Sequence, residues 1–160
     1  MTPRIIGLDQ RYAASASLVR YGVEIITVRD ERGARFDSAT RSLFRLIQRD
    51  GPGVWDHLAG AAKALRWRLI TDPMPIERNA QLTAAAGEVG RQARQLIGAV
   101  DEDALLREIA DAAAALCTRD PLVGAVLRES LTEVGPESAV VVAASSRSRE
   151  ALGEWLGSLG

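Results

Sequence analysis

The 160-residue sequence predicts an α+β fold with a short N-terminal β-meander, a helical middle of four to five helices and a C-terminal strand–helix unit. Three patterns support this prediction. β-Branched residues crowd residues 17–28, apolar residues recur with helical spacing after residue 38, and residues 139–143 (AVVVA) are wholly apolar. We expect a single domain over residues 1–160, divided into a β segment (1–37), a helical region (38–134) and a βα unit (135–160), the last of which could instead begin a further α/β domain.

The N-terminal part carries the pattern of short strands. Residues 4–9 (RIIGLD) form a first apolar run, and residues 17–28 (SLVRYGVEIITV) alternate partly between apolar and polar side chains. Residues 30–33 (DERG) have the composition of a turn, after which residues 34–36 would continue the meander.

Helical periodicity begins at Ser38, with Leu43, Phe44 and Ile47 on one face and Asp37 or Ser38 as the N-cap. Glycine and proline divide the rest of this region, because both are unfavourable in helix interiors. The helices expected are residues 38–50, 54–69, 76–98, 101–116 (capped by Asp101) and 121–134.

The last part of the chain begins after the Gly135-Pro136 break. Residues 139–143 contain no polar side chain, and a strand of that kind normally lies inside a sheet that is covered on both faces. A polar turn follows at residues 145–149 (SSRSR), and then Leu152, Trp155, Leu156 and Leu159 recur with helical spacing. The pattern predicts a strand, a turn and an amphipathic helix.

The distribution of charge, the cysteine content and the lack of long apolar runs limit the ligands and the cellular location that we expect. Residues 1–70 carry a balance of +5 and residues 71–160 a balance of −6, so the N-terminal half is the one that could face a polyanion. The single Cys117 excludes an internal disulfide. No apolar run approaches the ~20 residues of a membrane span, and no signal peptide is evident, so we expect a cytoplasmic protein without a membrane partner.

Residues with catalytic chemistry are sparse. One histidine, His57, and one distant cysteine do not suggest a zinc site, and the glycine-rich phosphate loops of nucleotide-binding proteins are absent, so no cofactor is predicted. Asp9 ends the first predicted strand, a placement that resembles the metal-binding aspartate of ribonuclease H-like nucleases. With Glu24 it is a weak candidate for Mg²⁺ chemistry, which normally needs several carboxylates.

A basic stripe is the strongest binding candidate in the N-terminal half. Arg41, Arg45 and Arg49 fall at i, i+4 and i+8, opposite the apolar face of the predicted helix. Such a stripe either contacts phosphates of a nucleic acid or is the solvated side of a helix.

Residues 120–160 resemble the opening of the second motor lobe of superfamily 1 and 2 helicases: a helix, an apolar strand, a polar turn with Ser and Arg, and a further helix. The resemblance implies that Ser146 and Arg147 lie at the carboxyl end of the strand, facing a phosphate-binding cleft. The first motor lobe, with its phosphate loop, has no counterpart in the sequence. Alternatively, the strand could pair with the N-terminal β segment and complete one domain.

These patterns favour a non-catalytic interaction or accessory domain, as the N-terminal region or a subunit of a larger, helicase-like nucleic-acid-processing assembly. Its partner would be another protein or a second copy, with nucleic acid as a further ligand. Two alternatives stay open. One is a small Mg²⁺-dependent nuclease or phosphotransferase that uses Asp9, and the other is a structural oligomer in which the 76–98 helix pairs with its copy.

Overall fold

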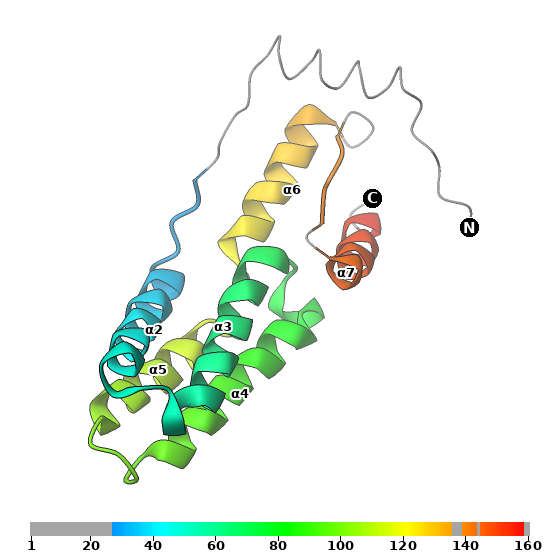
Figure 1. Ribbon diagram of the computed structural model, residues 1–160. Coiled ribbons are helices and arrows are strands. Elements are labelled where there is room, and N and C mark those ends of the chain that lie inside the picture. The colour runs from blue at the N-terminus through cyan, green and yellow to red at the C-terminus, as the bar shows by residue number, and fades with distance from the viewer. Residues whose placement is uncertain (1–26, 136–138, 144, 159–160) are drawn as a thin grey trace.

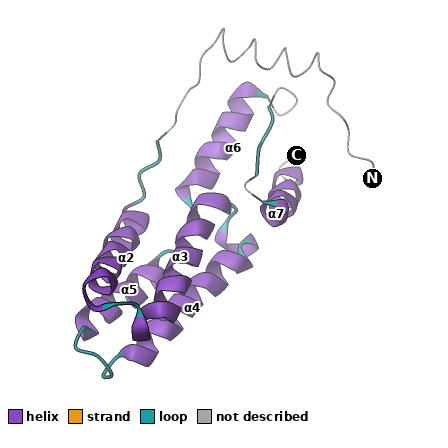
Figure 2. Ribbon diagram, in the orientation of Figure 1, coloured by secondary structure: helices purple, strands orange, loops and turns teal. Residues whose placement is uncertain are grey.

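The computed structural model describes residues 27–135, 139–143 and 145–158. Figure 1 and Figure 2 show helices joined by loops, and no β-strand, in this part of the chain. The elements are α2 (Glu31–Asp50), the 3₁₀ turn η1 (Gly53–Trp55), α3 (Asp56–Thr71), the 3₁₀ turn η2 (Ile76–Arg78), α4 (Ala80–Leu96), α5 (Asp103–Ala115), α6 (Leu122–Val134) and α7 (Ser146–Gly157).

Helices α2 to α5 pack around one apolar core. Helix α4 lies against both α3 and α5, and α5 also packs on α2. Burial of each large aliphatic or aromatic side chain contributes about 1.5–3 kcal/mol to stability. The large side chains of this core that are fully buried are Phe36, Leu43, Leu58, Leu65, Leu82, Val89, Leu106 and Ile109.

The predicted α+β class is wrong for the described residues, and its first error lies at the start of α2. Residues 30–33 form the beginning of a helix and not a turn in a β-meander. The Asp30 carboxylate accepts a hydrogen bond of 3.0 Å from the Arg32 amide, as an N-cap does, and Glu31 favours the positive end of the helix. Phe36, expected in a strand, is a buried helical residue. Residues 1–26, which contain the predicted strand 4–9 and most of the predicted strand 17–28, lie outside the described residues, and residues 27 and 28 belong to no strand.

The second error concerns the C-terminal strand–helix unit. Residues 139–143 belong to no β-ladder within the described chain, and Val140 and Val142 are 89% and 88% exposed. A fully apolar strand is buried where it lies inside a covered sheet, and the described residues provide no strand beside this segment. Helix α7 is present, but it does not follow a sheet strand.

Helices do occupy the segments expected between residues 38 and 134, with shifted ends. Gly51, at φ +87°, ends α2, and its amide bonds back to the Ile47 carbonyl. Asn79 caps α4 by accepting from the Leu82 amide. Asp101, expected as a cap, is not one: α5 begins at Asp103, whose carboxylate accepts from the Gly98 amide.

Helices α6 and α7 lie outside the four-helix unit, as Figure 1 shows. They share a second, small apolar cluster that consists of Met74, Leu152 and Trp155, with Leu127 and Ala143 packed at its edge. No helix of the described chain is both long and apolar enough to span a bilayer.

Candidate interaction surface on α6 and residues 139–143

Polar contacts fasten the beginning of α6 to the four-helix unit. The Arg32 guanidinium donates to the carbonyl oxygens of Arg119 and Asp120, at 3.2 and 3.3 Å. The Asp120 carboxylate in turn accepts a hydrogen bond of 2.8 Å from the Ile76 amide. The connection between α5 and α6 is therefore tied both to the start of α2 and to η2.

Gly124 brings the first turn of α6 against the connection between α3 and α4. A Cβ atom at this position would collide with the carbonyl oxygen of Pro73 and lie 3.5 Å from the Trp155 ring. Gly124 is the only residue of α6 that is buried. Gly124 thus permits the close contact that holds the first turn of α6. The rest of α6 extends away from the four-helix unit.

Large apolar side chains are exposed on α6 and on the extended segment after it. Six of the nine exposed ones among the described residues lie between residues 122 and 142. Exposed apolar side chains that are adjacent mark interaction surfaces more often than single ones do, and Val140, Val141 and Val142 are consecutive. The six are Leu122, Val123, Val134, Val140, Val141 and Val142.

We call residues 139–143 the valine segment. Its side chains alternate: Val140 and Val142 point into solvent, whereas Val141 is 38% exposed and Ala143 packs on the small apolar cluster. Its backbone makes no hydrogen bond with other described residues. An extended segment with unpaired amide and carbonyl groups is a template for pairing with another strand.

A buried carboxylate holds α7 beside this segment. The Ser148 hydroxyl donates to Asp72 at 2.9 Å, and the other Asp72 oxygen lies 2.9 Å from the Arg68 guanidinium. Asp72 is 1% and Ser148 2% exposed. Asn79 also donates to the Asp72 carbonyl oxygen at 2.7 Å, so the carboxylate lies in a turn that is itself hydrogen-bonded.

Two further contacts fix the ends of α7. The Ser145 hydroxyl caps the helix by accepting from the Ser148 amide at 3.1 Å. At the other end, Arg78 donates to the Ser158 hydroxyl at 2.7 Å. Because α6 and α7 are both anchored, the valine segment is held between two fixed helices.

The predicted basic stripe lies on the exposed face of α2, but it is partly neutralised. Arg41 forms an ion pair with Asp37, and Arg49 pairs with Asp50 at 2.6 Å and lies 3.6 Å from Glu102. The hydrogen bond and charge of Arg49 lower the pKa of Asp50. Arg45 is exposed and makes no ion pair with a described residue.

The other predicted site residues are not brought to this stripe. Ser146 is the exposed first residue of α7, and Arg147 follows in the same turn, with a side chain outside the described part. Helices α2 and α7 lie on opposite sides of the molecule in Figure 1. Asp9 and Glu24 lie outside the described residues.

Sequence reasoning missed Asp72, Asn79 and Ser148. A signal for Ser148 was present, because it falls four and seven residues before Leu152 and Trp155 and so shares their helical face. No pattern in the sequence pairs it with Asp72.

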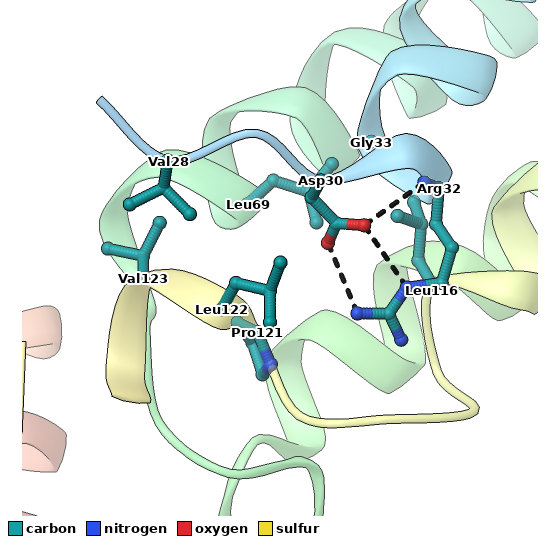
Figure 3. A pocket seen from close by; sticks show the side chains of 9 residues that line it. All are labelled: Val28, Asp30, Arg32, Gly33, Leu69, Leu116, Pro121, Leu122 and Val123. Carbon is teal, nitrogen blue, oxygen red and sulfur yellow. Dashed lines mark hydrogen bonds and ion pairs between the residues drawn. The ribbon is translucent and has the colours of Figure 1, made fainter. Parts of the chain in front are cut away.

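A hollow between the start of α2 and the start of α6 has a volume of about 90 Å³ (Figure 3). Val28, Leu69, Leu122 and Val123 line it with the Asp30–Arg32 ion pair at one side. Sites for small molecules usually enclose about 300–1,000 Å³. This hollow is therefore suited to a single side chain at most.

Groups with potential chemistry are separated from one another in the described chain. His57 stands near the start of α3, on the side of Glu88, whereas Ser148 and Asp72 meet at the far end of that helix. Partial burial raises the pKa of the Cys117 thiol. No cluster of three or more His, Cys, Asp or Glu side chains in the described residues could hold a metal ion.

Comparison with protein-family models found no family that matches this chain, and no curated protein and no solved structure matched it either.

Proposed function

We propose that this chain is a non-catalytic interaction domain, in which the four-helix unit is a scaffold that presents α6 and the valine segment to a partner protein. The observation that carries the proposal is the exposure of Val140 and Val142, at 89% and 88%. Burying such side chains in an interface stabilises a complex by about 1.5–3 kcal/mol each, before the costs of association.

The anchoring of the two flanking helices supports this function. A segment that is held extended loses less conformational entropy on binding than a free chain does. Gly124 against Pro73 fastens α6, and Ser148 against Asp72 fastens α7. The valine segment is thereby prepared for pairing before a partner arrives.

Site-specific photo-crosslinking tests the proposal. A photoreactive residue at position 142 of the full chain should give an adduct with another polypeptide. The same residue at position 70 is the matched control, because Ile70 is also highly exposed but lies on α3, away from the proposed surface. Adducts of equal yield at both positions, or none at position 142, would refute the proposed surface.

Nucleic-acid binding through α2 is a second candidate, supported by the exposure of Arg41, Arg45 and Arg49 on one helix face. Exposed ion pairs such as Arg41–Asp37 are worth roughly 0–1 kcal/mol, so a phosphate could replace the carboxylate at small cost. Fluorescence anisotropy with labelled DNA and RNA tests this. The triple change of these arginines to Gln should remove salt-sensitive binding, and binding that survives it would leave the stripe a solvated face.

The wider setting rests on the sequence alone. The resemblance of residues 120–160 to a helicase motor lobe makes a nucleic-acid-processing assembly the setting that we propose, with Ser146 and Arg147 toward a phosphate. Metal-dependent chemistry at Asp9 and Glu24 stays a prediction, as does a cytoplasmic location.

Oligomerisation through α4 is less favoured by the packing. The apolar stripe of this helix, Leu82, Ala86, Val89 and Ala93, is already buried in the core. A second copy would therefore meet the polar face of α4, whereas the valine segment offers an apolar one.

A further inference from the structure

We propose that the occupant of the valine segment is the same segment of a second copy, paired antiparallel about a two-fold axis at Val141. This inference rests on the proposed function, because it names the partner that the exposed surface receives. Three features support this inference. They are the symmetric sequence of the valine segment, the absence of backbone hydrogen bonds from it to other described residues, and the charges on the helix ends that flank it.

The order of residues is self-complementary. Residues 139–143 read AVVVA in both directions. In an antiparallel pair centred on Val141, Val140 lies opposite Val142 of the second copy, and each alanine lies opposite an alanine. A symmetric dimer requires a surface that matches itself in this way, and paired β-branched side chains are favourable cross-strand neighbours.

Within the described part of the chain, the backbone of the valine segment is open to this pairing. The valine segment runs as an extended stretch between α6 and α7 in Figure 1, the exposure of its side chains alternates, and it makes no backbone hydrogen bond with other described residues. Strand addition at such an edge satisfies the amide and carbonyl groups of both segments together. The contacts that anchor α6 and α7, Gly124 against Pro73 and Ser148 against Asp72, do not involve the valine segment.

The charges at the flanking helix ends are unfavourable within one copy and complementary between two. Helix α6 has no basic residue in its last turn and carries Glu133 there, and α7 has no acid in its first turn and carries Arg149. These signs are opposite to those that a helix dipole favours. Both side chains are exposed, and neither forms an ion pair with a described residue.

Antiparallel pairing brings these ends together. Glu133 lies eight residues before Val141 and Arg149 eight residues after it. Because paired segments run in opposite directions, the pairing directs the C-terminal end of α6 toward the N-terminal end of α7 in the second copy, and these two ends carry opposite charges. Two such contacts, related by the two-fold axis, would flank the ladder.

Disulfide trapping tests both the partner and the register. In a Cys117→Ala background, Val140→Cys and Val142→Cys are prepared as separate full-length chains. Directly opposite residues of an antiparallel pair lie about 4.5–5.5 Å apart at Cα, within disulfide range, whereas diagonal neighbours lie about 7–8 Å apart. A mixture of the two chains should therefore crosslink at least several-fold faster than either chain alone.

Other outcomes overturn the inference. If either single variant crosslinks with itself as fast as the mixture does, the register is wrong. If the mixture is no faster than an Ile70→Cys control, the segments do not pair. An adduct of position 142 with a different protein in the photo-crosslinking experiment would then leave the proposed function standing without this partner, and no adduct there would remove both.

Charge exchange gives an independent readout that does not touch the valines. Glu133→Arg alone should weaken self-association several-fold in sedimentation velocity. The double change Glu133→Arg with Arg149→Glu should restore it, because each chain then carries both partners of the exchanged pair. A double variant that associates as weakly as the single one would contradict the proposed arrangement. Both residues are exposed, so the helical circular dichroism should be unchanged.

Discussion

The Ser148 hydroxyl donates a hydrogen bond of 2.9 Å to the buried carboxylate of Asp72, which lies 76 positions earlier in the chain. This bond ties α7 to the end of α3. Ser148 is also hydrogen-bonded to Ser145, the N-cap of α7, which follows shortly after the valine segment. The interaction surface therefore depends on a contact that is not part of it.

Ser148→Ala should loosen α7. The change leaves one acceptor of the buried Asp72 carboxylate with fewer donors, which costs about 1–3 kcal/mol of unfolding free energy. Ser146→Ala is the matched control, because Ser146 is exposed in the same helical turn and should change stability by less than about 0.5 kcal/mol. Urea unfolding and hydrogen exchange of the α7 amides measure both. Equal effects of the two changes would show that the Asp72 contact does not hold the helix.

Gly124→Ala should destabilise the protein although alanine is the better helix former. The added methyl group would collide with the Pro73 carbonyl and force α6 away from the turn after α3. Gly87→Ala on α4 has no atom within 4 Å of the new Cβ and should instead stabilise the protein, by about 0.5–1 kcal/mol. Thermal unfolding shows whether each change lowers or raises the melting temperature. If both changes stabilise the protein, α6 is not pressed on Pro73.

Thr40→Val should raise stability by about 1 kcal/mol, because the Thr40 hydroxyl is buried and has no hydrogen-bond partner among the described residues. Thr71→Val is the contrasting change. The Thr71 hydroxyl lies 3.0 Å from both the Trp67 carbonyl and the Asp72 carboxylate, so its loss should lower stability by a similar amount. Chemical denaturation distinguishes the two. A destabilising Thr40→Val would mean that the hydroxyl is satisfied in solution.

Acid should weaken the contact of Glu88 with Arg91 and Gln92. The hydrogen bond from Arg91, with that from Gln92, lowers the pKa of Glu88 from 4.5 to about 2. A carboxyl group whose pKa is lower in the folded protein stabilises it fully above the unfolded value, and that stability is lost as pH falls from about 4.5 to about 2. NMR titration of the Glu88 carboxyl carbon should show the low pKa, rising toward 4.5 in Arg91→Gln. A normal pKa in the unmodified protein would contradict it.

The helices between residues 38 and 134 were predictable because their signals are local. Leu43 and Ile47 recur with helical spacing, and Gly51 ends the helix that they mark. Asp30 shows the limit of such reasoning. An Asp before Glu and Gly is typical of both a turn and a helix N-cap, and the burial of Phe36 in the core decides between them.

The candidate surface depends on which segments lie beside one another in the folded protein, and a single sequence does not show this. The apolarity of residues 139–143 was visible, but whether a sheet covers them depends on strands elsewhere. Ser146 was predicted as a site residue from the helicase resemblance alone, and nothing in that resemblance distinguishes the environment of Ser148. The rotation of α7, set by Leu152 and Trp155 against Met74, turns Ser148 toward Asp72 and leaves Ser146 in solvent.

Sedimentation velocity over a wide range of concentrations tests the central claim most directly, on the full chain and on the double variant Val140→Ser with Val142→Ser. We expect the unmodified chain to form a dimer whose fraction rises with concentration, and the variant to stay monomeric with the same helical circular dichroism. An unmodified chain that stays monomeric at every concentration, or a variant that associates equally well, would contradict pairing through the valine segment.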